Sequence, residues 1–232
     1  MTNRRDQLLA ELAGGVIASI QARPGGPLDR PDVLAALAAS AVEGGAVALR
    51  VDRPENIAAV AAVTDRPILG INKVIVPGYD VYITPTVQSA ADAIDAGAQL
   101  LAVDGTDRTR PDGTMLTDIV DYAHARDVLV FADISTFDEG QYAAHCGADI
   151  IATTLAGYTA YSSRPTDGPA LELAAELVQR LSAPIAVEGG IVTPAQVKAA
   201  FAAGVWAVCI GGAISNIAAI TQRFVRASKE HS

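Results

Sequence analysis

Residues 96–106 read "AGAQLLAVDGT", and this stretch contains the unit that decides the predicted fold. An alanine-rich helical segment ends at a glycine, and a short apolar run follows and closes on Asp104. Runs that are apolar on both faces are typical of parallel strands covered by helices, whereas half-solvated strands alternate polar and apolar residues. The stretch therefore predicts a helix followed by a buried parallel strand. Similar glycine-containing segments lead into three further apolar runs: "GGAV" (44–47), "CGAD" (146–149) and "AGVW" (203–206).

The same alternation of apolar runs and alanine-rich segments of helical period extends along the whole chain. Eight such pairs in 232 residues predict an α/β fold, a single (β/α)8 TIM barrel that occupies residues 1–232. Strands are expected at residues 15–21, 46–51, 67–73, 100–106, 128–135, 149–155, 184–190 and 206–213. Helices are expected at residues 32–43, 54–63, 87–96, 114–126, 138–146, 169–181, 194–203 and 216–227.

The first residues, "MTNRRDQLLAELAGG" (1–15), superficially resemble a twin-arginine export signal, but Glu11 interrupts the apolar region that such a signal needs. A short N-terminal helix before the first strand is predicted instead. No apolar stretch approaches the roughly 20 residues that span a bilayer. Cys146 and Cys209 lie in apolar surroundings and do not indicate a disulfide scaffold, so a cytoplasmic location is expected.

Composition limits the classes of partner. Half of the residues (50%) are hydrophobic and 19% are charged, which is typical of a compact globular chain. The net charge of -9 repels nucleic acid and anionic membranes, and no basic run offsets it. A small phosphorylated molecule remains a suitable ligand if a few cations or backbone N–H groups converge on one site.

In a barrel of this kind the chemistry takes place at the carboxyl ends of the strands. Lys73 ends the third predicted strand, where it is either a surface lysine or a base in a pocket. An apolar surround made of Ile71 and residues 74–76, or a nearby cation such as Arg50, would lower the pKa of this lysine. Its position at a strand end favours the base.

Two carboxylates end strands of the same ring, Asp133 and Glu188. Together with Lys73 they suit proton transfer beside a carbonyl, although a salt-bridge network that closes the barrel top is the alternative. Asp104 is either a metal ligand or a loop cap. His124 and His145 fall on predicted helices and His231 lies in the tail, so no metal site is expected.

Glycine pairs lie at the carboxyl ends of the last two predicted strands, Gly189 with Gly190 and Gly211 with Gly212. Loops at these two positions commonly form the phosphate site of a (β/α)8 barrel, because glycine lets backbone N–H groups approach the phosphate oxygens. Ordinary tight turns are the alternative for each pair alone. Their occurrence at both strands favours phosphate binding.

At this point the strand-end motifs resemble the N-acetylmannosamine-6-phosphate 2-epimerase family over nearly the whole chain. Two of the motifs are quite specific, "ADIST" (132–136) and "TTLAGYT" (153–159). The other matching motifs are "SIQA" (19–22), "ALR" (48–50), "GINK" (70–73), "VYITPT" (81–86), "TRPDG" (109–113) and "VEGGIVTP" (187–194).

The resemblance implies interconversion of N-acetylmannosamine 6-phosphate and N-acetylglucosamine 6-phosphate in sialic acid catabolism, without a cofactor. Lys73 would then remove the C2 proton of the ring-opened sugar, and Glu188 would assist as acid or base. The residues that would bind the sugar are Gln21, Arg50, Asp133, Thr154 and Tyr158. This chain departs from the family at Val74, Gly190 and Asn216, where members commonly carry a basic residue.

Other functions remain open from the sequence. Lys73 would also suit another sugar-phosphate isomerase, or an aldolase that forms a Schiff base. A barrel that binds a phosphorylated metabolite without catalysis is a candidate of a different class. Barrels with apolar helix faces commonly pair with a second copy, so a homodimer is expected.

Overall fold

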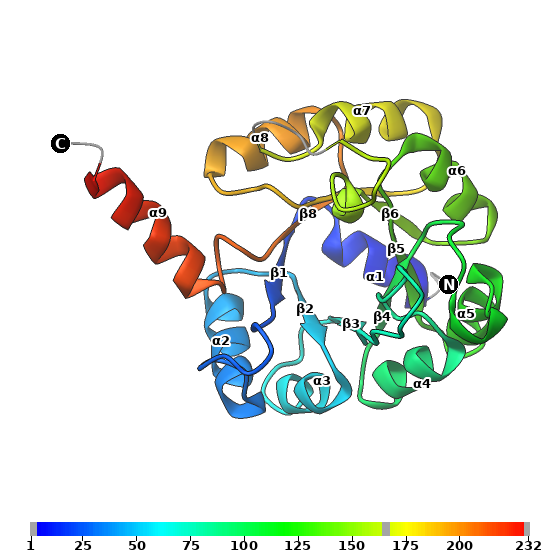
Figure 1. Ribbon diagram of the computed structural model, residues 1–232, viewed down its shortest axis with the longest axis horizontal. Coiled ribbons are helices and arrows are strands. Elements are labelled where there is room, and N and C mark those ends of the chain that lie inside the picture. The colour runs from blue at the N-terminus through cyan, green and yellow to red at the C-terminus, as the bar shows by residue number, and fades with distance from the viewer. Residues whose placement is uncertain (1–3, 164–167, 230–232) are drawn as a thin grey trace.

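The computed structural model describes residues 4–163 and 168–229 (Figure 1). Within them, parallel strands form a closed barrel in which each strand pairs with the next and β8 pairs with β1. The predicted (β/α)8 barrel is therefore confirmed. The strands are β1 (Val16–Ile20), β2 (Ala48–Asp52), β3 (Ile68–Ile71), β4 (Leu100–Asp104), β5 (Leu129–Asp133), β6 (Ile150–Ala152), β7 (Ile185–Glu188) and β8 (Ala207–Ile210).

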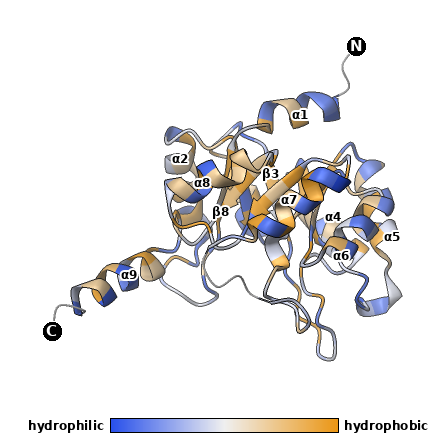
Figure 2. Cartoon of the chain, turned by 90° about the horizontal axis from the view of Figure 1, so that it is seen from above, coloured by the Kyte–Doolittle hydropathy of each residue, from blue (hydrophilic) through white to orange (hydrophobic). Residues whose placement is uncertain are grey.

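Helices surround this barrel and alternate with its strands (Figure 1). The first helix lies across one end of the barrel, and the long loops extend from the opposite end (Figure 2). The helices are α1 (Arg4–Leu12), α2 (Pro31–Glu43), α3 (Pro54–Ala61), α4 (Val87–Asp95), α5 (Leu116–His124), α6 (Phe137–His145), α7 (Leu171–Arg180), α8 (Pro194–Ala202) and α9 (Ile217–Lys229). The described residues also contain the short 3-10 helices η1 (Pro111–Gly113) and η2 (Thr153–Leu155).

The glycine before each even-numbered strand has a conformational cause. Gly97 follows the end of α4 with a φ of 113°, in the left-handed region where a side chain is strained. Gly45, Gly147 and Gly204 have φ values of 95°, 93° and 87°. The glycine thus ends each helix and turns the chain into the next strand.

Several strands end earlier than predicted. The predicted run 67–73 stops at Ile71, so Lys73 lies in the following loop and forms an isolated antiparallel bridge with Ile83. The loop folds back on itself there, because Thr84 bonds to Asn72 through both its backbone and its hydroxyl. Both glycine pairs likewise follow β7 and β8 instead of ending them.

The barrel interior explains how the site residues converge. Alternate residues of each strand point inward, and the inner core includes Leu129 with Phe131 of β5 and Ala186 of β7. The next residues in the same alternation are Asp133 and Glu188, one layer nearer the carboxyl end. The apolar residues therefore fill the lower layers, and the polar residues form the top layer.

The opposite end of the barrel is covered by α1. Leu12 is buried, and the indole N–H of Trp206 donates to the Leu9 carbonyl at 3.0 Å. Asp149 joins α1 to the barrel by accepting hydrogen bonds from Arg5 and from the backbone of Val130 in β5.

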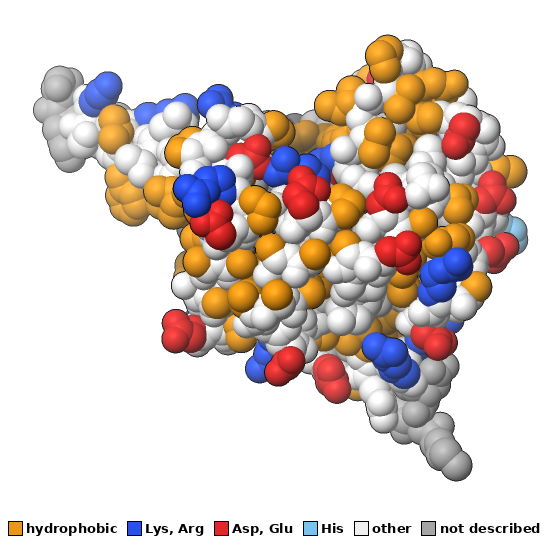
Figure 3. Space-filling view, turned by 90° about the horizontal axis from the view of Figure 1, so that it is seen from below, with side chains coloured by type: hydrophobic (Ala, Val, Ile, Leu, Met, Phe, Trp, Pro, Cys, Tyr) orange, Lys and Arg blue, Asp and Glu red, His pale blue; other side chains and the backbone are white. Residues whose placement is uncertain are grey.

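The last helix, α9, projects away from the barrel instead of packing between α8 and α2 (Figure 1). None of its residues is buried, and Phe224 is 74% exposed. Figure 3 shows apolar side chains gathered along one side of this helix. Across the described part of the chain, no helix combines the length and apolar character needed to cross a membrane.

Candidate active site

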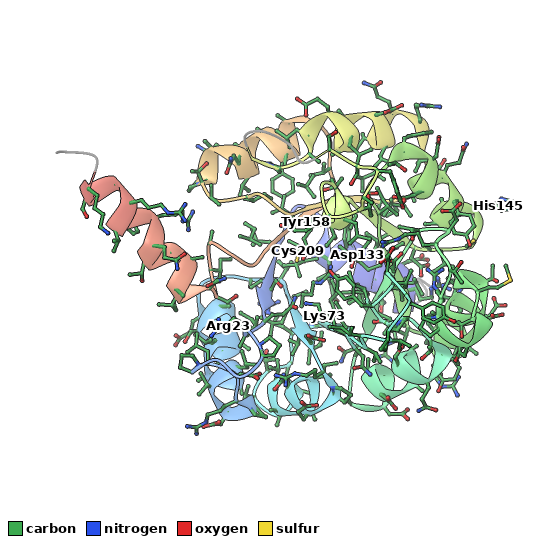
Figure 4. All side chains as sticks on the ribbon, in the orientation of Figure 1. Arg23, Lys73, Asp133, His145, Tyr158 and Cys209 are labelled. Atoms are coloured by element: carbon green, nitrogen blue, oxygen red, sulfur yellow. The ribbon has the colours of Figure 1, made fainter. Side chains whose placement is uncertain are left out.

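A cavity of about 380 Å³ opens at the carboxyl end of the barrel. Lys73, Asp133, Tyr158 and Cys209 gather around the barrel centre, whereas His145 lies on the outer side of α6 (Figure 4). Of the residues predicted for the site, the cavity is lined by Gln21, Arg50, Lys73, Thr154, Tyr158, Glu188, Gly189, Gly190, Gly211 and Gly212. Asp133 is fully buried and lies outside this lining.

Arg50 joins the two predicted carboxylates beneath the cavity. Its guanidinium makes a two-bond pair with Asp133, at 3.0 and 2.5 Å, and also donates to Glu188. The Arg50 side chain is 2% exposed and that of Asp133 is 0% exposed. The salt-bridge network foreseen as an alternative is therefore present, and it forms the floor of the cavity.

Glu188 is the carboxylate of this network that faces the cavity, with its side chain 13% exposed. Burial raises its pKa, and the Arg50 cation opposes that rise. Thr154 adds a further constraint, because its hydroxyl donates to Asp133 at 2.5 Å and lies 3.3 Å from Glu188. The raised pKa brings Glu188 closer to the range in which a carboxyl both gives and takes protons.

Lys73 reaches the same cavity from the loop after β3. Its ammonium group donates to the Gln21 side chain, whose own amide donates to Ser19 at 2.8 Å. Burial lowers the pKa of Lys73, the Asp52 carboxylate raises it, and the Arg50 cation lowers it further. The prediction that Arg50 lowers this pKa agrees with the structure.

The predicted apolar surround of Lys73 is wrong in one respect. Ile75 is 84% exposed and Val74 is 38% exposed, because this segment forms the outward-facing part of the loop. The walls of the cavity, and not these neighbours in sequence, cover part of the lysine, whose side chain is 35% exposed.

Asp104 serves as a loop cap, the second of the two roles considered for it. It accepts hydrogen bonds from the Thr106 backbone and hydroxyl, at 3.0 and 2.6 Å, and pairs with Arg108 at 2.6 Å. Within residues 4–163 and 168–229, no group of three or more His, Cys, Asp or Glu side chains is arranged to hold a metal ion. His124 and His145 lie on α5 and α6, and His231 lies outside the described residues.

The glycine pairs face the cavity from the ends of β7 and β8. Gly189 and Gly190 have φ values of 95° and 74°. A Cβ at Gly190 would lie 2.3 Å from the Gly168 carbonyl oxygen, so this backbone has no room for a side chain there. Glycine at this position, where the family commonly carries a basic residue, therefore fits the close approach of the two loops.

The other two departures have local explanations as well. Val74 belongs to the exposed loop, and Asn216 caps α9 by accepting a hydrogen bond from the Ala219 backbone at 3.0 Å. Asparagine is among the favoured residues at the N-cap, the position just before the first helical residue.

Three residues of the site with titratable side chains were not among the predicted residues. Tyr82 and Cys209 line the cavity, and Asp52 lies beside Lys73. Asp52 had a signal in the sequence, because it lies two residues after Arg50 on the same strand and therefore on the same face. Cys209 pairs in register with Glu188, which no local pattern reveals.

Residues 34–230 match the model of the family described as "Putative N-acetylmannosamine-6-phosphate epimerase". The chain belongs to this epimerase family. A curated relative from Cutibacterium acnes, named "Putative N-acetylmannosamine-6-phosphate 2-epimerase", is 41% identical over 97% of this chain and 98% of its own. One of the same name from Yersinia pseudotuberculosis is 41% identical over 97% of this chain and 94% of its own.

A solved structure supports the same membership of the epimerase family. The N-acetylmannosamine-6-phosphate 2-epimerase from Clostridium perfringens matches with a TM-score of 0.93 and 35% identity, over 97% of this chain and 98% of that one. Thiamine phosphate pyrophosphorylase from Pyrococcus furiosus matches with a TM-score of 0.62 at 16% identity, which shows a shared fold alone.

Proposed function

We propose that this chain interconverts N-acetylmannosamine 6-phosphate and N-acetylglucosamine 6-phosphate by proton exchange at C2, without a cofactor. Family membership supports the substrate and the reaction. The observation that carries the mechanism is one cavity lined by Lys73, Glu188 and both glycine pairs. These groups provide a base, an acid and an anion site around one small molecule.

Lys73 acts as the base in this proposal. The hydrogen on C2 becomes acidic once the sugar ring opens and C1 becomes an aldehyde. A neutral amine takes that proton and leaves an enolate with its negative charge on the C1 oxygen, and return of a proton to the opposite face of C2 gives the epimer. Burial lowers the pKa of Lys73, which increases the neutral fraction that can accept the proton.

Glu188 assists as acid or base at the oxygen on C1. The developing enolate oxygen on C1 needs a nearby donor, and a carboxyl with a raised pKa provides one. Arg50 and Thr154 hold this carboxyl in place from below, and Gln21 holds the Lys73 amine from the side. Asp133 contributes through its bonds to Arg50 and Thr154.

The phosphate is expected at the glycine loops. Backbone N–H groups of Gly189, Gly190, Gly211 and Gly212 suit a phosphate because they approach its oxygens without a side chain in between. Tyr158 lines the cavity from the loop after β6 and is 58% exposed, so we expect it to contact the sugar.

Proton exchange in heavy water tests the proposal directly. The wild-type protein should place deuterium at C2 of either 6-phosphosugar, as followed by NMR, and Lys73→Ala should abolish the exchange. Lys198→Ala is the matched control, because Lys198 is an exposed lysine of α8 on the outside of the barrel. Lack of exchange by the wild-type protein with both sugars would refute the proposed reaction.

Borohydride separates this mechanism from an aldolase. A covalent adduct trapped on Lys73 would indicate a Schiff base, whereas the epimerase mechanism needs none. Tight binding of sugar phosphates without turnover would instead indicate a metabolite-binding barrel.

We also infer that the protein works in the cytoplasm as a homodimer. The uncovered apolar side of α9 supports the dimer, because Ile217, Phe224 and Val225 contact solvent in a single chain. An apolar groove of about 420 Å³ beside α8 is uncovered in the same way, and a second copy would bury both surfaces. Light scattering on the full chain tests this: a dimer is expected, with dissociation in Phe224→Asp, and a wild-type monomer would refute it.

A further inference from the structure

We propose that Asp52 is a positioning residue that holds Lys73 for proton transfer through both the main chain and the side chain of the lysine. The inference rests on the proposed role of Lys73 as the base. Asp52 lies at the end of β2, and its carboxylate lies beside the Lys73 amine.

The first contact fixes the main chain. Lys73 lies beyond β3, where the strand ladder no longer holds it, and its backbone N–H donates to Asp52 Oδ1 at 3.0 Å. Asp52 itself is the last residue of β2 and pairs in register with Ile71. The carboxylate therefore extends the β2–β3 pairing to the lysine, which directs the side chain toward the cavity.

The second contact acts on the amine. Asp52 Oδ2 lies 3.8 Å from Lys73 Nζ, with the carboxylate side chain 19% exposed and the lysine side chain 35% exposed. The Lys73 amine is the donor to Gln21, so it is held between a neutral amide and an anion. These two contacts limit the positions that the amine at the end of the flexible, four-carbon Lys73 side chain can occupy.

Other charged groups face Lys73 from the rest of the barrel. Arg50 lies on β2, Asp133 on β5 and Glu188 on β7, and the pKa of Lys73 responds to all three. The carboxylates of Asp133 and Glu188 are both bonded to Arg50, whose positive charge offsets theirs. Tyr82 and Cys209, which are also titratable, line the same cavity. Asp52 thus supplies the carboxylate that forms an ion pair with the lysine.

The end of β2 is itself held in place. The Asn56 side chain donates to the Asp52 carbonyl at 2.8 Å, and the Arg53 backbone donates to the Ile71 carbonyl at 2.9 Å. Asn56 is 1% exposed, so the support comes from the core. Because its backbone is anchored independently, Asp52 can lose its charge without losing its place.

Asp52→Asn is the decisive variant, because an amide oxygen can still accept from the Lys73 backbone while the negative charge is gone. Asp52 raises the pKa of Lys73, so removal of its charge lowers that pKa. The amine then stays neutral to lower pH, and the acidic limb of the pH profile of kcat/KM should move to lower pH by roughly one unit. Asp52→Ala loses the main-chain contact too and should also lower kcat, by about tenfold or more.

Labelling of Lys73 provides a readout that does not need turnover. The pH dependence of its modification by trinitrobenzenesulfonate, located by peptide mass spectrometry, should shift by the same amount in Asp52→Asn. Asp95→Asn, at the exposed end of α4, is the charge-matched control and should shift neither profile. Trp206 fluorescence verifies folding, and Asp52→Ser removes the same charge if the Asn variant does not fold.

The results separate this inference from the proposed function. A shift of both profiles supports the role of Asp52. A labelling shift in a protein that exchanges no C2 proton would refute the proposed reaction but uphold the contact between Asp52 and the amine. Unshifted labelling in Asp52→Asn, or equal kcat in Asp52→Asn and Asp52→Ala, would overturn the inference.

Discussion

Replacement of Arg50 by methionine tests the cation at the centre of the buried charge network beneath the cavity. The substitution keeps an apolar chain of similar length but leaves Asp133 and Glu188 without their cation. Removal of one partner from a buried ion pair costs about 3–5 kcal/mol, because the remaining charge has lost its solvent and its counter-ion. For a chain of this size that loss corresponds to a fall in melting temperature of roughly 6–20 °C.

The loss should depend on pH, and its direction follows from Glu188. Burial already raises the pKa of this carboxyl, and without the opposing Arg50 cation the pKa rises further. A folded-state pKa above the unfolded value contributes stability at low pH, and this contribution is lost as pH rises through the folded pKa. Arg50→Met should therefore be less destabilised at pH 5 than at pH 8.

Unfolding in urea measures both effects, with circular dichroism and the fluorescence of Trp206, the single tryptophan, as the probes. Arg30→Met is the matched control, because Arg30 pairs with Asp32 at 2.6 Å with both side chains 66% exposed. Solvent screens that pair, so its loss should leave the transition unchanged. A loss below about 1 kcal/mol for Arg50→Met, or an equal loss at both pH values, would refute the reasoning.

Two further substitutions test the loops around the cavity. Gly190→Ala should destabilise the fold by about 1–3 kcal/mol, measured by urea unfolding, because it strains a left-handed residue and its Cβ meets the Gly168 carbonyl. Gly212→Ala is the control and should not destabilise the fold, because the space around its Cβ is open. Equal effects of the two substitutions would contradict this reasoning. Tyr161→Phe removes the hydroxyl that donates to buried Glu139. Loss of this hydrogen bond costs about 1 kcal/mol of loop anchoring, so KM for the 6-phosphosugar should rise roughly fivefold with little change in kcat. Steady-state kinetics measure this, and an unchanged KM would show that the bond does not hold the loop.

The sequence alone was enough for the fold and for most of the cavity. Both depend on local periodicity: a left-handed glycine such as Gly97 ends a helix, an apolar run follows, and alternate residues face one side. Because the carboxyl ends of the parallel strands meet at one end of the barrel, residues far apart in sequence such as Gln21, Lys73 and Glu188 were expected around one cavity. The family resemblance added the substrate and the roles, which no periodicity indicates.

Tertiary structure decided which of these groups pair and how they are charged. Arg50 bonds to Asp133 and Glu188 across 83 and 138 residues of sequence, and Asp52 rather than the apolar neighbours of Lys73 lies beside its amine. Closure of the barrel sets these distances, since the register of each strand fixes which side chains face one another. The projection of α9 is also beyond a local pattern, because its apolar face predicts a helix that packs and does not specify against which surface.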